Sequence, residues 1–167
     1  MSATETSPGT LAAQLFERLN AHDVAALRGY WKADTEQRFP DGTRRGPDEI
    51  AAWFEDLLAA SPDLRVDVVS LAERGDEVLV RWRARGTHTG GPFQGIAATG
   101  NAFVVDGADH FVIRDGRVVS NFVIYDQMQF ARAVGVLPVD GSAPDRALRT
   151  AFNAKTRFVE RVRAVRR

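Results

Sequence analysis

A carboxylate, an amide and a phenol are predicted to share one face of a β-hairpin in the C-terminal third of the chain. The segment 109–125 has the pattern of strand, turn and strand, and residues 115–117 are expected to form a three-residue loop in which a glycine follows a type I turn. Side chains alternate along a strand, so Asp109, Asn121 and Tyr125 lie on the same face among apolar neighbours. Apolar walls with a few convergent polar groups are typical of a small-molecule pocket.

Centring this loop on Gly116 gives the expected register of the hairpin. The predicted cross-strand pairs are Asp109 with Val123, Phe111 with Asn121, and Ile113 with Val119. Asp109 therefore has apolar neighbours along its own strand and opposite it, and the Asn121 amide lies close by.

Asp109 is the first candidate for catalysis. A carboxylate beside Phe111 and Ile113 loses solvation when it ionises, and this raises its pKa. Such a group can remove a proton from the carbon next to a carbonyl near neutral pH. The alternative is a bend residue beside Gly107 whose carboxylate binds backbone amides, and the residues alone leave both interpretations open.

Two further residues are candidate catalytic groups. His88 is expected to share a strand face with Trp82, where it donates a proton or binds an oxyanion; a buried histidine bonded to the backbone is the alternative. Asp126 follows the hairpin, and Gln129 three residues later gives it the pattern of a helix cap. Asp126 is therefore either a cap or a catalytic group turned toward the mouth of the cavity.

The expected pocket lining is largely aromatic and aliphatic. Its aromatic side chains are expected to form wall and core, which suits a flat polycyclic or phenolic ligand. Its amide and phenol either orient a substrate carbonyl or satisfy buried polar groups locally. The candidate substrate-binding residues are Tyr30, Trp53, Trp82, Phe111, Asn121, Val123 and Tyr125.

No cofactor and no metal ion are expected. The chain has no cysteine, and its three histidines (His22, His88 and His110) lack the spacing of metal ligands. It also has no phosphate-binding loop, dinucleotide-binding motif or nucleophile-elbow motif. The expected partner is a small molecule, handled by the side chains of the protein alone.

The composition is that of one globular domain without membrane contact. The chain has 167 residues, of which 44% are hydrophobic and 26% charged. No apolar run approaches the ~18 residues of a membrane span. The N-terminal residues lack the features of a secretory signal, so a cytoplasmic location is expected.

Charge is unevenly distributed along the chain. Basic and acidic residues are equal at 22 each, but residues 144–167 hold eight basic and two acidic side chains. A basic tail can bind nucleic acid, yet the rest of the chain is acidic and lacks interleaved aromatic and basic residues. We expect an amphipathic helix with a solvated arginine face and no nucleic-acid partner.

The periodicity of apolar residues changes from about 3.6 to 2 near Leu64, which predicts an α+β fold with helices first and antiparallel strands afterwards. A bulge or bend is expected at 106–107. A disordered leader (1–9), a domain (10–138), and a linker with a basic amphipathic helix (139–167) make up the chain. The expected helices are 10–21, 24–31, 46–60, 127–133 and 145–165, and the expected strands are 36–40, 64–71, 77–88, 99–114 and 117–125.

Three runs of sequence resemble the SnoaL-like polyketide cyclases, which belong to the NTF2-like superfamily together with ketosteroid isomerases. The runs are PDGTRRGPDEIAAWFEDL, VRWRARGTHTGGPFQGIAATG and FVIRDGRVVSNFVIYDQMQFARAVGVLP, and the similarity extends from about Leu11 to Leu137. The resemblance implies a cone-shaped α+β barrel, with helices packed on a curved, antiparallel or mixed sheet and often a homodimer through the outer sheet face.

The resemblance also bears on the reaction. The catalytic carboxylate of the polyketide cyclases corresponds to Val123, and their histidine on the preceding strand corresponds to Asp109. The limonene epoxide hydrolases of the same superfamily need an arginine two residues before the aspartate, and the resemblance places Gly107 at that position. His88 matches the histidine of the family's GTH run, and Asp126 matches a recurrent aspartate.

Taken together, these features favour a cofactor-free enzyme for a hydrophobic, polyketide- or steroid-like carbonyl compound. The expected chemistry is aldol cyclisation or isomerisation with Asp109 as the base. The alternatives are a ligand-binding or dimerisation protein without catalysis, and a hydroxylase-type SnoaL-like relative. The fold does not decide among them, because it hosts many reactions.

Overall fold

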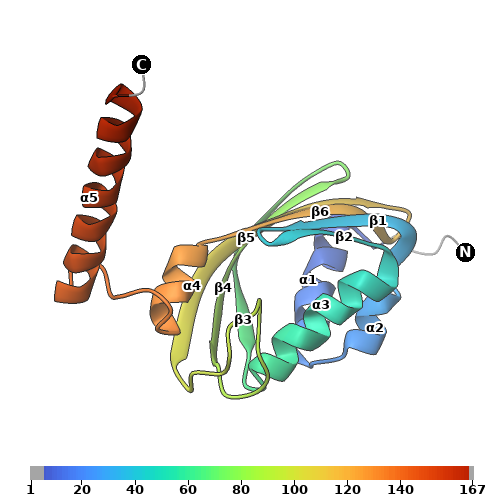
Figure 1. Ribbon diagram of the computed structural model, residues 1–167. Helices are drawn as coiled ribbons and strands as arrows, with labels where there is room; N and C mark the ends of the chain where they lie inside the picture. The colour runs from blue at the N-terminus through green and yellow to red at the C-terminus, as the bar shows by residue number, and fades with distance from the viewer. Residues whose placement is uncertain (1–5, 166–167) are drawn as a thin grey trace, which may run out of the picture.

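Helices occupy most of the first 60 residues, and strands most of the next 65. The computed structural model describes residues 6–165 (Figure 1). The helices are α1 (Pro8–Asn20), α2 (Val24–Arg28), α3 (Gly46–Ala60), α4 (Gln127–Ala133) and α5 (Ala143–Val165). The strands are β1 (Trp31–Phe39), β2 (Gly42–Arg45), β3 (Arg65–Arg74), β4 (Glu77–Thr87), β5 (Ala102–Arg114) and β6 (Arg117–Tyr125).

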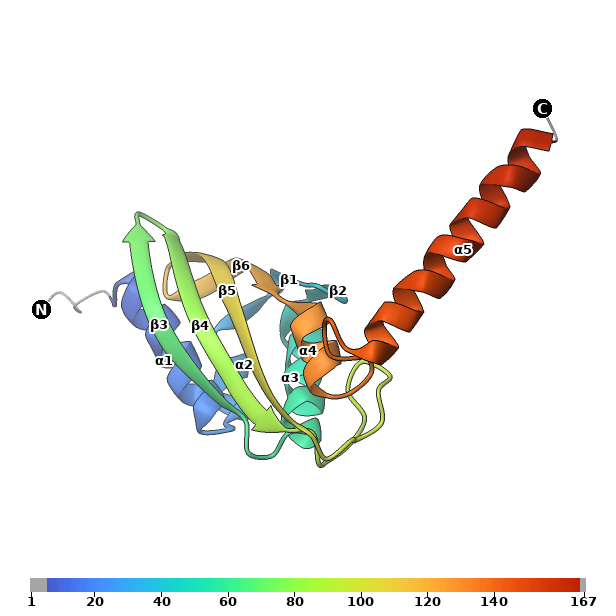
Figure 2. The same cartoon turned by 90° about the vertical axis from the view of Figure 1, so that its left-hand side faces the viewer.

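The six strands form one curved sheet in the order β2-β1-β6-β5-β4-β3. All neighbouring strands are antiparallel except β1 and β6, which are parallel. Helices α1, α2 and α3 lie on the concave face of the sheet (Figures 1 and 2). The predicted α+β fold, with N-terminal helices on a curved mixed sheet and an additional C-terminal helix, is confirmed.

Strand β4 illustrates how alternation builds the core. Val78, Val80 and Trp82 point toward the helices and are buried, whereas Leu79 and Arg81 between them are exposed. The same alternation continues on β5, so the two central strands present one apolar face to the helices.

The turn between β5 and β6 differs from the expected three-residue loop. Asp115 and Gly116 both adopt positive φ, at 51° and 66°, and Arg114 pairs directly with Arg117. This is the two-residue, type I′ kind of turn, whose twist matches that of the flanking strands. An Asp-Gly pair favours it because both residues tolerate a left-handed backbone.

An irregularity in β6 restores the predicted register beyond the turn. Ile113 pairs with the buried Val118 and not with Val119, which is exposed, so the predicted pair at this level was wrong. Val119 is one extra residue in β6, which bulges the strand and shifts the pairing by one. From there on the register is as predicted, with Asp109 opposite Val123.

Helix α1 begins two residues before the expected start. Its first residue is Pro8, because the Ser7 side chain accepts a hydrogen bond from the Thr10 N–H and caps the helix. The leader expected at residues 1–9 therefore includes the cap and the first turn of α1, and residues 1–5 lie outside the described part of the chain.

Strand β1 begins five residues before the extended piece expected at 36–40. Helix α2 ends at Arg28, with Gly29 at its C-cap, and Trp31 pairs with Val118 of β6. The helix predicted as far as Trp31 was therefore wrong at its C-terminal end. Pairing with a strand that is distant in sequence overrode the local helical pattern.

Gly107 marks a close approach between two strands rather than the expected bulge. Strands β4 and β5 stay in register throughout their length. A Cβ on Gly107 would lie 2.3 Å from Cη2 of Trp82 and 2.7 Å from the Ile124 carbonyl oxygen. Glycine is required here because the Trp82 ring fills the space of a side chain.

Helix α5 extends away from the rest of the molecule (Figure 2). Every residue from Arg146 to Ala164 is exposed, so this helix does not cover the outer face of the sheet. None of the helices within residues 6–165 combines the length and the apolar character needed to cross a membrane.

Replacing Gly107 with alanine should destabilise the fold, because the new methyl group overlaps the Trp82 ring. We expect the free energy of unfolding, measured by urea denaturation, to fall by about 1–3 kcal/mol. Gly91→Ala is the matched control, since a Cβ at Gly91 would have no atom within 4 Å. Equal stabilities of the two variants would contradict this account of Gly107.

Candidate active site

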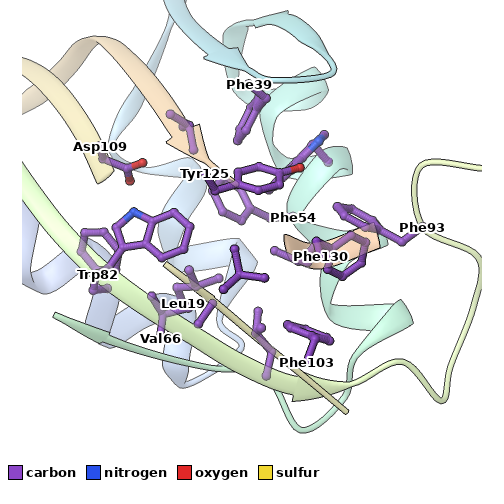
Figure 3. A pocket seen from close by; sticks show the side chains of 17 residues that line it. Leu19, Phe39, Phe54, Val66, Trp82, Phe93, Phe103, Asp109, Tyr125 and Phe130 are labelled. Carbon is purple, nitrogen blue, oxygen red and sulfur yellow. The ribbon is translucent and has the colours of Figure 1, made fainter. Parts of the chain in front are cut away.

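An apolar cavity lies between the concave face of the sheet and the helices (Figure 3). The cavity has a volume of about 90 Å³, and the empty space with its open mouth included is about 680 Å³. The cavity is therefore narrow. Its walls are aromatic and aliphatic, and Asp109 is the one charged residue among the described residues that line them. The aromatic wall residues are Phe16, Phe39, Trp53, Phe54, Trp82, Phe93, Phe103, Tyr125 and Phe130.

Asp109 lies at the inner end of this cavity, on β5. It is only 8% exposed, and its Oδ1 atom is buried without a hydrogen-bond partner in the described part of the chain. Burial raises the pKa of Asp109 to about 7, and the nearby Trp82 and Asn121 side chains offset this shift only in part. A carboxyl group with such a pKa exchanges its proton near neutral pH.

The Trp82 side chain turns its indole nitrogen toward Asp109 (Figure 3). The indole N–H of Trp82 is buried and, like Oδ1 of Asp109, has no partner in standard hydrogen-bond geometry within residues 6–165. The position of the ring follows from the space at Gly107 on the adjacent strand. Trp82 thus supplies a desolvated hydrogen-bond donor next to the carboxyl group.

Two more polar side chains lie beside Asp109 and Trp82, namely Asn121 on β6 and Gln37 on β1. Asn121 lies diagonally across from Asp109 on β6, and Gln37 pairs with Asn121 from β1. Both are almost fully buried, and Oδ1 of Asn121 and Oε1 of Gln37 have no partner within the described residues. Together with Asp109 they line a second, smaller cavity that continues from the first.

Trp31 and Gln37 were missed as site residues by the sequence analysis. The Trp31 indole N–H is also buried and unpartnered within residues 6–165, and Trp31 lines the second, smaller cavity together with Gln37. A period-2 signal was present, since Thr35, Gln37 and Phe39 alternate and all three are buried. This alternating pattern was short. The parallel pairing of β1 with β6, which places Gln37 beside Asn121, leaves no pattern in the local sequence.

A second pair of polar side chains, Gln94 and Tyr125, lies near Phe93, on the side of the cavity away from Asp109. The Gln94 amide donates a hydrogen bond of 2.7 Å to the Tyr125 hydroxyl. Burial raises the pKa of Tyr125 above its usual value, so the phenol stays protonated. Because its oxygen already accepts from Gln94, the Tyr125 hydroxyl is free to donate to another acceptor.

The predicted site residues divide into two sets. Asp109, Trp53, Trp82, Val123 and Tyr125 line the main cavity, and Phe111 and Asn121 line its inner extension with Asp109. The structure thus brings together seven of the ten.

The other three predicted residues lie elsewhere. His88 is fully buried next to the Phe130 ring, with ring centroids 6.5 Å apart, and does not line the main cavity. Asp126 caps α4 by accepting a hydrogen bond of 2.9 Å from the Gln129 N–H. Tyr30 lies near Gln14 of α1, away from the cavity wall.

No group of three or more His, Cys, Asp or Glu side chains suited to a metal ion occurs within residues 6–165. Asp109 has no second carboxylate or histidine among the residues that line its cavity with it. The groups available for chemistry at this site are one carboxyl group, two unpartnered indole N–H groups, two amides and a phenol; the third cavity indole, that of Trp53, donates to Asp41.

Residues 12–121 match the family model described as the SnoaL-like domain. This stretch covers most of the chain, including β1 to β5, the first part of β6, and Asp109. The chain belongs to the SnoaL-like family. A search of curated protein sequences gave no significant match.

Several solved structures superpose on this chain over nearly their whole length. A candidate SnoaL-like polyketide cyclase from Jannaschia sp. CCS1 is 25% identical with a TM-score of 0.72, covering 83% of this chain and 98% of its own. IdmH, a candidate polyketide cyclase from Streptomyces antibioticus, is 28% identical with a TM-score of 0.68, covering 77% and 99%. AclR, a candidate hydroxylase from Streptomyces galilaeus, is 23% identical with a TM-score of 0.71, covering 81% and 100%.

This SnoaL-like chain thus has the predicted NTF2-like fold, and the expected resemblance is confirmed. The relatives carry names for different reactions, so the fold alone does not select one. This chain is longer than these relatives, which it covers almost completely.

The raised pKa of Asp109 makes the stability of the fold depend on pH. Folded Asp109 keeps its proton up to about pH 7, whereas in the unfolded chain the carboxyl group titrates near 3.8. Between these values Asp109 binds more protons in the folded state, so its contribution to the free energy of unfolding decreases as the pH rises. A pKa difference of this size corresponds to roughly 4 kcal/mol.

Asp109→Asn should remove this dependence, because the amide does not ionise. We expect the stability of the variant, measured by urea denaturation from about pH 4 to 8, to increase relative to the parent up to about pH 7 and then to stay level. Asp115→Asn in the β5–β6 turn is the matched control. A difference between Asp109→Asn and the parent that does not change with pH would contradict the raised pKa.

Proposed function

We propose that this SnoaL-like protein is a cofactor-free enzyme that removes a proton next to the carbonyl group of a hydrophobic compound. The observation that carries this proposal is the position of Asp109, a buried carboxyl group with a pKa of about 7 at the end of an otherwise apolar cavity. The reaction is an aldol cyclisation or an isomerisation of a polyketide- or steroid-like substrate. Names of relatives as candidate polyketide cyclases support the same class.

In the first step, ionised Asp109 takes a proton from the carbon next to the carbonyl. The electron pair of the broken C–H bond forms the carbon–carbon double bond of an enolate, and the carbonyl oxygen becomes negative. The unpartnered Trp82 indole N–H, next to Asp109, is placed to donate to this oxygen. Such a donor in a water-poor cavity stabilises charge far better than the same donor in water.

In the second step, the enolate carbon forms a new bond. In a cyclisation it attacks another carbonyl carbon of the same molecule, and protonated Asp109 returns its proton to the alkoxide. In an isomerisation, Asp109 returns the proton to a different carbon of the conjugated system. Both outcomes leave the carboxylate regenerated, so no oxidant or cofactor is needed.

The remaining polar groups suit a substrate with an oxygen at each end. Asn121 and Gln37 offer unpartnered amide oxygens to a hydroxyl group at the inner end. Tyr125, held by Gln94, offers a hydroxyl donor on the opposite side. The aromatic walls between them suit a flat apolar body.

Hydrogen–deuterium exchange provides a test that needs no knowledge of the natural product. The protein should catalyse deuterium incorporation at the α-carbon of a hydrophobic cyclic ketone such as 2-tetralone in heavy water, followed by NMR. The rate should rise with pH and become constant above about pH 7, because ionised Asp109 is the base. Asp109→Asn should lower it by at least about a hundredfold.

The controls separate catalysis from folding and binding. Quenching of the fluorescence of the cavity tryptophans by the ketone should be similar in the Asp109→Asn variant and the parent. Asp126→Asn is the matched variant: asparagine also caps helices, so its exchange rate should equal that of the parent. Unchanged exchange in Asp109→Asn would reject Asp109 as the base.

A protein that binds a ligand without catalysis is the second candidate. It is favoured by Val123, which occupies the position where the resemblance places the carboxylate base of polyketide cyclases. Tryptophan quenching without any deuterium exchange would support this candidate over the enzyme. A hydroxylase activity is supported only by the name of AclR, and at 23% identity the similarity to AclR shows the fold and not the reaction.

We also propose a homodimer through the outer face of the sheet. This face exposes four large apolar side chains on three neighbouring strands: Leu79 on β4, Val104 on β5, and Phe122 and Ile124 on β6. Such a patch is typical of a contact between subunits.

A further inference from the structure

Helix α5 has a large apolar surface that the rest of the described chain leaves mostly exposed. Leu148, Phe152 and Phe158 are all more than half exposed, and Phe158 reaches 68%. The first two turns are held in place, where Asp140 contacts both Arg132 of α4 and Arg149 of α5. A 23-residue helix with an exposed apolar stripe gains little stability by itself, which indicates an external partner.

The apolar side chains of α5 lie on one side of the helix. At 100° per residue, Leu148, Phe152, Phe158, Val159 and Val162 fall within an arc of about 120°, and small alanines extend it. Arg146, Arg157 and Glu160 lie on the opposite side. The helix is therefore amphipathic over its whole length.

The charge of α5 is strongly positive. The helix holds six basic and two acidic residues, and Lys155, Arg157, Arg161 and Arg163 make no salt bridge within residues 6–165. Lys155 lies in the middle of the apolar arc. The partner must therefore accept apolar side chains and positive charge on the same surface.

A second copy of the chain does not meet these requirements. Pairing two α5 helices through their apolar arcs would bring the Lys155 side chains into the same seam and place two strongly positive helices side by side. The outer face of the sheet is also unsuitable, because Arg38 and Arg81 on that face have no acidic partner among the described residues. Nucleic acid would neutralise the arginines but leave Phe152 and Phe158 exposed.

We propose that α5 is a membrane-surface helix that binds anionic lipid. Its apolar arc enters the boundary between head groups and acyl chains, and Lys155 extends its amine to the head-group level. Arg163, which borders the arc, contacts the anionic head groups, and the arginines farther round the helix add longer-range attraction to the anionic surface. The helix lies in the plane of the membrane surface and does not cross it. It differs from the sequence-based expectation of a solvated arginine face and no membrane partner, and it does not rest on the function proposed for the cavity.

A membrane-bound α5 would bring the cavity close to a source of hydrophobic compounds. A compound with an apolar body concentrates in membranes, so a domain held at the surface meets it at a higher local concentration. The domain and α5 are joined by the short segment 134–142, so the cavity stays within a few tens of ångströms of the lipid.

Co-sedimentation of the full-length protein with vesicles tests this proposal. Vesicles of equal parts phosphatidylcholine and phosphatidylglycerol should carry the protein into the pellet, and phosphatidylcholine vesicles should carry at least about tenfold less. Raising the salt from about 0.1 M to about 1 M should release most of the bound protein, because the Debye length falls from about 10 Å to about 3 Å.

Two variants with the same change in charge separate the apolar arc from the polar face. Phe158→Glu should lower the vesicle partition coefficient by about tenfold or more, through lost apolar burial and added negative charge. Asn153→Glu, on the polar face, should lower it several-fold less. Both side chains are exposed, so circular dichroism should show both variants folded like the parent.

Three results would overturn the proposal. The protein could remain in the supernatant with anionic vesicles at low salt. It could bind neutral and anionic vesicles equally, which would remove the role of the arginines. It could fail to bind vesicles while Phe158→Glu alone converts a dimer to a monomer in light scattering, which would identify a second copy as the partner.

Discussion

The exclusion of water from the carboxyl group of Asp109 is the constraint on which the proposed chemistry of this cavity depends. Asp109 has a pKa near neutrality only because β4, β5 and β6 place apolar side chains around it and the N-terminal helices close the inner end. Each wall residue thus contributes to the basicity of a group that it does not chemically assist. The same burial lowers stability when Asp109 ionises, so the rest of the core must be stable enough to tolerate a charged form.

Much of the site follows from alternation along strands. Period 2 placed Asp109, Asn121 and Tyr125 on one face, and the register at Asp109 was correct although the turn was not, because the extra residue at Val119 offset the shorter loop. His88 is buried as well, but it lies six residues beyond Trp82 and is packed beside Phe130, so sharing a face with Trp82 did not make it a cavity residue.

The part of the site on β1 was not predictable in this way. Trp31 comes directly after a helical pattern, and no local signal separates it from that pattern. Gln37 belongs to β1, whose neighbour in the sheet, β6, follows about eighty residues later in the chain. Parallel pairing over such a distance leaves no turn signature between the partners. Residues contributed by such strands are visible only once the sheet order is known.

Gly107 and Trp82 have a consequence for how this family can change. The indole can lie beside Asp109 only while position 107 lacks a side chain, since the two would occupy the same volume. Substitutions at the two positions are therefore coupled. A side chain at position 107 requires a smaller residue at position 82, and the indole donor is then lost. A pair of facing residues on β4 and β5, neither of them acid or base, thus restricts which chemistries evolution can reach from this cavity.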